Sequence, residues 1–219
     1  MADVKSFFLS ADAHEYLVAH GTPPDDIQRD LIAETRKLGD ISGMQIAPEQ
    51  GAFMTTFTRL IAARRAVEVG VFTGYSSLCI ARGLPDDGRL LSLDVSEEWT
   101  SIGRRYWERA GVASKIDLQL GPAADTLRAL PEDEMFDLAF IDADKPNYRT
   151  YYEEVLRRMR SNGAILVDNV LWGGRVLDPS ADDDNTKAIK EFNDFVASDD
   201  RVDAVVLPLS DGLTIARKR

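Results

Sequence analysis

Short apolar runs separated by helical stretches organise the chain from residue 65 onward. Each run is rich in Val, Ile, Leu, Ala or Phe without polar alternation, as expected for strands buried on both faces. The runs are Ala66–Val69, Leu90–Asp94, Ile116–Leu120, Phe136–Ile141, Ala164–Val167, Val202–Leu207 and Leu213–Ala216. Strands alternating with helices predict an α/β fold with a doubly wound, mostly parallel seven-stranded sheet. Pro208 and Gly212 suit a tight turn before the last run, so we expect that strand to be antiparallel.

The first 62 residues have helical patterns instead. One helix is expected over Ala11–Ala19, a second over Asp25–Leu38, and a third from Pro48. This helical preface has too few apolar positions for a core of its own. We therefore expect a single domain over residues 1–219, with a preface and lid at 1–62 and an α/β core at 63–219.

The stretch Ala66–Ser76 reads as a buried strand, a glycine turn and the start of a helix. Glu68 places a carboxylate within the apolar strand, where it requires a specific partner. Gly70 and Gly74 allow the backbone to approach a ligand lying across the strand end. Phe72 stands where the dinucleotide fingerprint G-x-G-x-x-G needs a glycine, so a pyrophosphate is not indicated. A packed corner in which Glu68 only caps a neighbour is the alternative.

Asp94 ends the second predicted strand, 24 residues after Gly70. An acidic residue at this place commonly accepts hydrogen bonds from the ribose hydroxyls of a nucleoside. The alternative is a helix cap, because a helix is expected to begin just after it. Ser96 is itself a good cap, which leaves Asp94 for a ligand.

Oxygen ligands follow the fourth and fifth predicted strands. Asp142 comes directly after one, and Asp168 and Asn169 after the other. Neighbouring parallel strands bring such ends together, and hard oxygen ligands suit Mg²⁺, Ca²⁺ or Mn²⁺. Lys145 is expected at the N-cap of the next helix, ahead of Pro146, where a cation is a poor choice and indicates a functional site. Two unrelated polar strand ends are the alternative.

Composition restricts the partners. A chain of 219 residues with 44% apolar and 29% charged residues is typical of a globular protein, and its net charge of −11 disfavours non-specific nucleic-acid binding. The single cysteine, Cys79, excludes an intramolecular disulfide and is expected to be a buried hydrophobe. No signal peptide or membrane-spanning run is seen, so we expect a cytoplasmic location. The two histidines, His14 and His20, lie in the preface and do not indicate a Ser-His or Cys-His pair.

Taken together, the motifs resemble those of the cation-dependent O-methyltransferases of the caffeoyl-CoA and catechol type, especially their bacterial members. The matching stretches, in family order over almost the whole chain, are Met44–Gly51, Glu68–Ser76, Asp142–Lys145, Asp168–Trp172 and Asp184–Lys187.

The resemblance implies S-adenosylmethionine as methyl donor, in a Rossmann-like methyltransferase fold. The positions it assigns to this cofactor are Met44, Ile46, Glu68, Gly70, Val71, Ser76, Asp94, Ala123, Asp142, Asp144 and Tyr151. Asp94 would hold the ribose and Ala123 would lie by the adenine. The resemblance also makes Asp142, Asp168 and Asn169 the metal ligands, with Mg²⁺ favoured, and explains why no pyrophosphate loop is needed.

The mechanism implied is metal-assisted methyl transfer to a catechol-like aromatic. A phenol has a pKa near 10 and is a weak nucleophile at neutral pH. A divalent cation favours its ionised form, and Lys145, beside Asp142, would remove the proton. The ionised oxygen would then attack the methyl group of the donor in line.

Two further functions remain open. One is methylation of a hydroxylated tRNA nucleoside by the same fold, for which an arginine patch at Arg157–Arg160 would be the contact surface. The other is a cofactor-binding module without catalysis. Gly173-Gly174 stands where plant members of the family carry a substrate-contacting Asn, which weakens the case for a coenzyme A thioester. A homodimer is expected from the resemblance alone.

Overall fold

The sheet runs through the whole molecule and has seven strands in the order β3-β2-β1-β4-β5-β7-β6. The computed structural model describes residue 6, residues 8–133 and residues 135–219. The strands are β1 (Arg65–Val69), β2 (Arg89–Asp94), β3 (Ile116–Leu120), β4 (Phe136–Ile141), β5 (Met159–Val167), β6 (Val202–Leu207) and β7 (Leu213–Lys218). Strands β1 to β5 pair in parallel, whereas β7 is antiparallel to both β5 and β6. The predicted fold class is confirmed.

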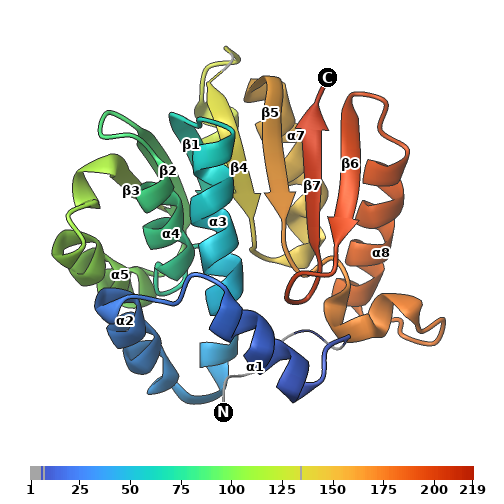
Figure 1. Cartoon of the computed structure of the whole chain (residues 1–219). Helices are drawn as coiled ribbons and strands as arrows, with labels where there is room; N and C mark the ends of the chain where they lie inside the picture. Colours follow the sequence, from blue (N-terminus) through green and yellow to red (C-terminus); the bar gives the residue numbers. More distant parts are fainter. Residues whose placement is uncertain (1–5, 7, 134) are drawn as a thin grey trace.

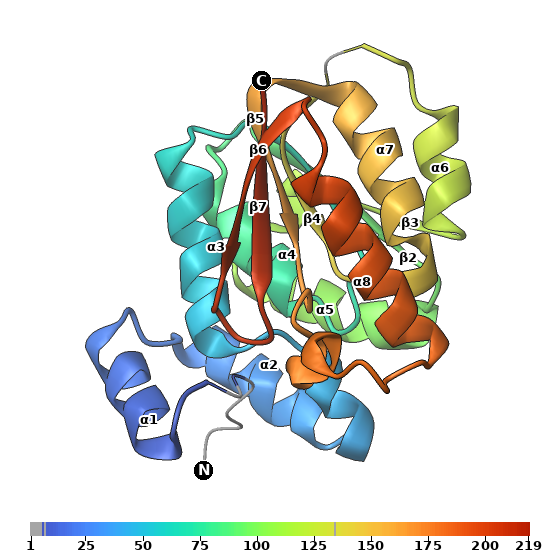
Figure 2. The same cartoon turned by 90° about the vertical axis from the view of Figure 1, so that its right-hand side faces the viewer.

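Helices cover both faces of this sheet. The helices are α1 (Ala11–His20), α2 (Asp26–Arg36), α3 (Pro48–Leu60), α4 (Tyr75–Gly83), α5 (Glu97–Arg109), α6 (Ala123–Ala129), α7 (Tyr148–Arg158) and α8 (Asp184–Ala197). Figures 1 and 2 show α3, α4 and α5 on one face and α6, α7 and α8 on the other. The buried side chains accordingly form two clusters, one on each side of the sheet. Strands β1, β4 and β5 contribute buried side chains to both clusters, which explains why their sequences are continuous apolar runs.

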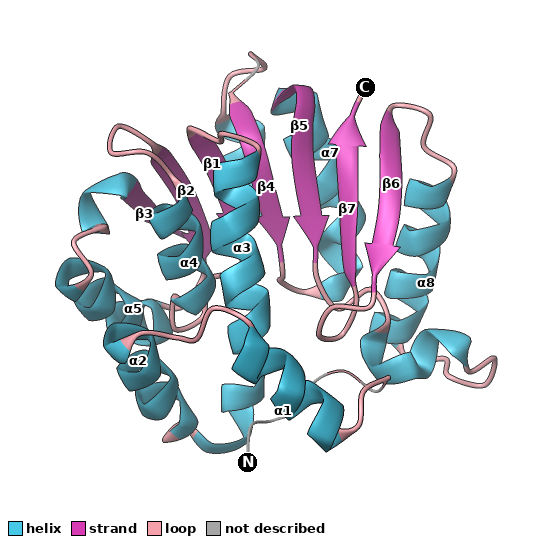
Figure 3. Cartoon of the chain, viewed as in Figure 1, coloured by secondary structure: helices cyan, strands magenta, loops and turns pink. Residues whose placement is uncertain are grey.

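Helices α1 and α2 lie below the edge of the sheet toward which the arrowheads of β4 and β5 point (Figures 1 and 3). A short 3-10 turn, η1 (Gly39–Met44), connects α2 to α3. The amino-terminal segment therefore covers the carboxyl ends of the parallel strands. In the part of the chain that the structure describes, no helix is long and apolar enough to cross a membrane.

The start of β5 was predicted wrongly. Strand β5 begins at Met159, five residues before the predicted start at Ala164, and Met159 pairs with Phe136. Ser161 and Asn162 are exposed, and Asn162 has a left-handed backbone with φ of 62°. These polar residues interrupt the apolar pattern, so the first half of the strand cannot be recognised from that pattern.

Gly70 joins the ends of β1 and β4 by an unusually close approach. Its φ is +93°, and a Cβ atom there would lie 2.0 Å from the carbonyl oxygen of Asp142. The amide of Asp142 in turn donates to the carbonyl of Val69 at 2.9 Å. Only glycine satisfies both the backbone conformation and the distance.

Gly70→Ala is therefore expected to lower the free energy of unfolding by about 4 kcal/mol or more, because backbone atoms must move apart. Gly111→Ala is the matched control, since its φ is +68° and nothing lies within 4 Å of the added Cβ. It should cost only about 1 to 2 kcal/mol for the left-handed conformation. Urea unfolding of both variants measures the difference, and equal losses would show that the close approach is unimportant.

Candidate active site

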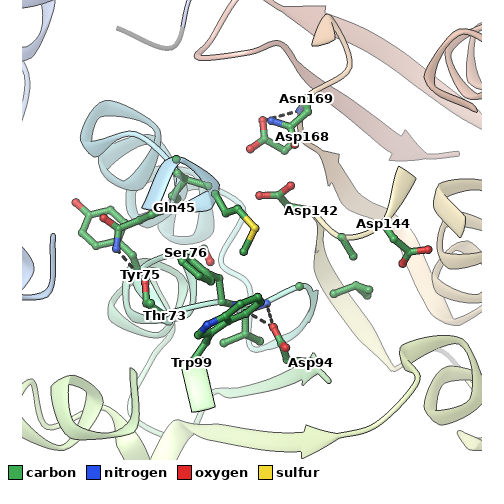
Figure 4. A pocket seen from close by; sticks show the side chains of 18 of the residues that line it. Gln45, Thr73, Tyr75, Ser76, Asp94, Trp99, Asp142, Asp144, Asp168 and Asn169 are labelled. Carbon is green, nitrogen blue, oxygen red and sulfur yellow. Dashed lines mark hydrogen bonds between the residues drawn. The ribbon is translucent and has the colours of Figure 1, made fainter. Parts of the chain in front are cut away.

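A cavity of about 1280 Å³ lies at the carboxyl ends of β1, β2, β4 and β5. Residues of α2, η1 and the start of α3 close it from the side of the amino-terminal segment. Its wall contains every candidate site residue except Glu68, namely Met44, Ile46, Gly70, Val71, Ser76, Asp94, Ala123, Asp142, Asp144, Lys145, Tyr151, Asp168 and Asn169. Figure 4 shows Asp94 and Trp99 in one part of this cavity and Asp142, Asp168 and Asn169 in another.

Asp94 fastens the glycine turn to the second strand. Its Oδ2 accepts hydrogen bonds from the backbone amides of Val71 at 2.8 Å and Phe72 at 2.9 Å. Its Oδ1 accepts from the amide of Ser96 at 2.8 Å, while the Ser96 side chain caps α5. Asp94 is thus not the helix cap. An ionised carboxylate has about four acceptor positions, so one remains for a ligand.

Glu68 is not among the residues that line the cavity, and its predicted contact with the cofactor stays a prediction. Because side chains alternate along a strand, Glu68 lies on the face of the sheet that α4 covers. It is fully buried and accepts hydrogen bonds from the hydroxyls of Ser77 and, at 2.9 Å, Ser92. Its Oε1 has no partner among the described residues. Burial raises the pKa of Glu68 to about 7.

The two strand ends bring three oxygen-bearing side chains together as predicted. Asp142 follows β4, and Asp168 and Asn169 follow β5. The amide of Asp168 donates to the carbonyl of Ile141 at 3.0 Å, which holds the ends in register. Asn169 has a left-handed φ of 57°, and its amide donates to Oδ1 of Asp168 at 2.8 Å. Burial, together with the charge of Asp142, raises the pKa of Asp168.

Lys145 lies within this cluster and is only 7% exposed. Its Nζ donates to Oδ1 of Asp142 at 3.1 Å, to Oδ1 of Asn169 at 2.7 Å and to the hydroxyl of Tyr148 at 2.5 Å. The Tyr148 hydroxyl donates to the carbonyl of Asp168 at 3.1 Å. Burial raises the pKa of Tyr148 well above its ordinary value, so its hydroxyl stays protonated. The side chain of Lys145 is therefore fixed toward the oxygen cluster.

The predicted N-cap position of Lys145 is wrong. Lys145 opens a 3-10 turn, η3 (Lys145–Asn147), with Asp144 before it, and α7 begins only at Tyr148. The carboxylate of Asp144 accepts from the side chain of Asn147 and, at 2.6 Å, from the hydroxyl of Tyr151, so it does not cap backbone amides. The extra turn separates Lys145 from the positive end of the helix dipole.

Two residues beside the cluster were missed from the sequence. Tyr148 offered only its spacing, three residues after Lys145, as a signal. Gln50 is fully buried in the first turn of α3, and its amide lies close enough to Asp168 to favour the ionised carboxylate, although neither amide atom completes a hydrogen bond among the described residues. A buried amide just after Pro48 was the available signal.

A doubly wound sheet whose cavity lies at the strand ends, with an acidic residue after the second strand, defines an enzyme fold for a nucleoside-containing cofactor. Residues 19–219 match the family described as O-methyltransferase. The chain is 40% identical over 207 residues to a probable caffeoyl-CoA O-methyltransferase 1 of Dictyostelium discoideum, covering 93% of this chain and 90% of the relative. It is 37% identical to a caffeoyl-CoA O-methyltransferase 1 of Zea mays, covering 98% and 87%.

Solved structures show the same similarity. The O-methyltransferase TomG of Streptomyces achromogenes, in complex with S-adenosylmethionine, has a TM-score of 0.85 at 30% identity, covering 93% of this chain and 94% of TomG. An O-methyltransferase of Bacillus cereus, in complex with S-adenosylhomocysteine, has a TM-score of 0.84 at 30% identity, covering 94% and 96%. The chain belongs to the O-methyltransferase family. The expectation of an S-adenosylmethionine-dependent O-methyltransferase is thereby confirmed.

The buried carboxylate of Glu68 should make stability depend on pH. Its folded pKa of about 7 lies above its unfolded value of 4.5, so the folded state binds the proton more tightly. Its contribution to stability therefore falls as pH rises from 4.5 to 7, by roughly 3 kcal/mol.

Glu68→Gln removes this titration. The free energy of unfolding of the variant minus that of the natural protein should therefore be larger at pH 8 than at pH 5. Urea unfolding of both proteins at the two pH values measures the change. A difference between the proteins that is the same at both pH values would contradict the raised pKa.

Proposed function

We propose that the enzyme transfers the methyl group of S-adenosylmethionine to a hydroxyl of a small catechol-like aromatic, with the help of a divalent cation. The observation that carries this proposal is that two arrangements open into one cavity. One is the glycine turn fastened by Asp94, and the other is the oxygen cluster around Lys145. A donor and an acceptor can therefore lie side by side.

The glycine turn and its surroundings form the donor site in this proposal. TomG and the Bacillus cereus enzyme, with similar folds, carry S-adenosylmethionine or its demethylated product. Asp94 has an acceptor position left for a ribose hydroxyl, and Trp99 offers a ring face beside it. Ala123, Asp144 and Tyr151 lie in the cavity wall. In this proposal Ala123 contacts the adenine, and Asp144 and Tyr151 contact the methionine end. Glu68 contributes indirectly, by holding Ser77 of α4 against β1.

The oxygen cluster fits a hard divalent cation. It contains the carboxylates of Asp142 and Asp168 and the amide oxygen of Asn169, which are ligands that Mg²⁺ prefers and that Mn²⁺ or Ca²⁺ also accept. Among the described residues no group of three or more His, Cys, Asp or Glu side chains could hold a metal ion. The candidate metal site is therefore this set of two carboxylates and one amide oxygen. Two neighbouring carboxylates, one of them almost fully buried, are costly unless a cation accompanies them.

When bound, S-adenosylmethionine supplies an activated methyl group and the cation favours the ionised form of the acceptor hydroxyl. Lys145 Nζ lies within the oxygen cluster and, once it has lost its own proton to become the neutral amine, is the group positioned to accept the hydroxyl proton. Trp172 flanks the same amine, with its ring 5.5 Å from Nζ, and offers a surface for an aromatic acceptor. The bound donor would supply the methyl group to the ionised hydroxyl oxygen with its sulfur as leaving group, and Lys145 would hold the proton that the hydroxyl loses.

The acceptor is proposed to be a small phenolic molecule. The two relatives are caffeoyl-CoA methyltransferases by name, which supports a phenolic ring. Gly173 and Gly174 both have left-handed φ values, and Gly173 lies in the cavity wall where a side chain would otherwise narrow it. The homodimer expected from the resemblance stays a prediction.

Methylation of tRNA loses its support in the structure. Arg158 is only 1% exposed and pairs with Glu154, while Arg160 pairs with Asp137. Arg157 pairs with Glu132 at 3.0 Å. The three arginines therefore already have acidic partners and do not form a free basic surface for phosphates.

Asp168→Ala, or treatment of the natural protein with EDTA, should lower the rate of catechol methylation on the order of 100-fold or more, because the cation is lost. Radiolabelled methyl transfer with and without added Mg²⁺ measures this. Asp125→Ala, which removes an exposed aspartate paired only with Arg128, is the control and should keep full activity. Catechol methylation that survives both Asp168→Ala and EDTA treatment would contradict the metal-assisted mechanism.

The acceptor class is tested with the same labelled donor offered to a catechol, to a caffeoyl thioester and to bulk tRNA. The catechol should be methylated and the tRNA should not, because the net charge is −11 and the arginines are paired. Methylation of tRNA in preference to the catechol would replace the proposed acceptor.

A further inference from the structure

All three hydrogen-bond donors of the Lys145 ammonium group have acceptors inside the site. Two of these acceptors, Oδ1 of Asp142 and Oδ1 of Asn169, are also proposed ligands of the divalent cation. The third acceptor is the hydroxyl of Tyr148, which is not a proposed ligand. The same oxygen atoms are therefore potential partners of two cations, the Lys145 ammonium group and a divalent metal ion from solution.

We propose that Lys145 competes with the divalent cation for the oxygens of Asp142 and Asn169. In this proposal Tyr148 is a positioning residue, because its hydroxyl keeps a hydrogen bond to Lys145 when those oxygens bind the metal. This inference rests on the proposed function. It adds a second role for the lysine, as a cation that tunes metal affinity, and it assigns a role to Tyr148.

Charge and burial support the competition. The cluster holds two carboxylates, and Lys145 supplies one positive charge in direct contact with that of Asp142. Asp168 is 2% exposed and Lys145 7% exposed, so water screens these charges poorly. A divalent cation that binds the same oxygens would compete with two hydrogen bonds of the ammonium group for their lone pairs and would also bind beside its charge. Both effects weaken metal binding.

The geometry of Tyr148 supports its role as the retaining residue. Its hydroxyl donates to the carbonyl of Asp168, which directs a lone pair of the same oxygen toward Lys145 Nζ. The ring is fully buried and packs edge-on against Phe192, with centroids 5.6 Å apart. Nζ also lies 4.7 Å from the centre of the Tyr148 ring. Tyr148 is thus a fixed acceptor that stays available when the other two oxygens are taken.

Retention by Tyr148 has a functional result. A lysine held by one neutral hydroxyl remains at the edge of the oxygen cluster, where the acceptor hydroxyl must lie. Without Tyr148 the ammonium group would have the oxygens of Asp142 and Asn169 as its remaining acceptors, and it would compete with the metal more strongly. Tyr148 therefore acts on the metal through Lys145.

Direct titration of the full-length protein with Mn²⁺, with free Mn²⁺ measured by electron paramagnetic resonance, tests this without any turnover. Lys145→Met should bind Mn²⁺ about fivefold or more tightly than the natural protein, because the competing charge is gone. Tyr148→Phe should bind it about threefold or more weakly. The double variant should have the affinity of Lys145→Met alone, because Tyr148 then has no lysine to hold.

Controls separate this inference from the proposed metal site. Arg36→Met removes an exposed cation that lines the same cavity and should change Mn²⁺ affinity by less than about twofold, since exposed charges are well screened. Asp168→Ala should weaken binding strongly. If Asp168→Ala leaves Mn²⁺ binding unchanged, the metal site itself is wrong.

If Asp168→Ala weakens binding but Lys145→Met binds Mn²⁺ no more tightly than the natural protein, the competition is wrong and the metal site stands. A double variant that binds more weakly than Lys145→Met would show that Tyr148 acts on the site by a route other than the lysine. Thermal unfolding verifies that each variant is folded, and Lys145→Gln replaces Lys145→Met if the latter unfolds.

Discussion

The contact between the ends of β1 and β4 is the constraint on which the site depends. Gly70 lies so close to the carbonyl of Asp142 that no side chain fits between them. The same pair of ends is joined by the hydrogen bond from the Asp142 amide to Val69, and the next pair by the bond from Asp168 to Ile141. The turn fastened by Asp94 and the oxygen cluster are therefore held at a fixed separation by backbone rather than by flexible side chains. Methyl transfer needs such a fixed separation between donor and acceptor.

The carboxylates in and near the site have different surroundings. In the oxygen cluster, the carboxylate of Asp142 faces the cavity with a cation, Lys145, beside it. Glu68, by contrast, is buried with two hydroxyl groups and no cation, and burial raises its pKa. The first arrangement suits binding of a metal and movement of a proton, and the second suits packing of α4 on β1.

Much of the site could be predicted because strand ends are visible in the sequence. Apolar runs locate the strands, and parallel pairing then brings Asp94, Asp142 and Asp168 to one edge of the sheet. The hydroxyl partners of Glu68, Ser77 and Ser92, could not be predicted because they come from α4 and β2, whose packing against β1 is not visible in the local sequence. The start of β5 at Met159 was hidden by polar residues that lie beyond the core. The cap position of Lys145 failed because a 3-10 turn lengthens the connection to α7, and local sequence does not specify such a turn.

The wall of the cavity is built from two kinds of element. The reactive side chains follow strands, whereas the opposite side is made by the 3-10 turns η1 and η4 (Trp172–Leu177), and η4 contains Gly173 and Gly174 in left-handed conformations. Short turns tolerate insertion and substitution far better than paired strands do. The acceptor that fits the cavity can thus change during evolution through substitutions in η4, while the side chains that follow the strands stay intact. A catalyst divided in this way is also a practical starting point for engineering regioselective methylation.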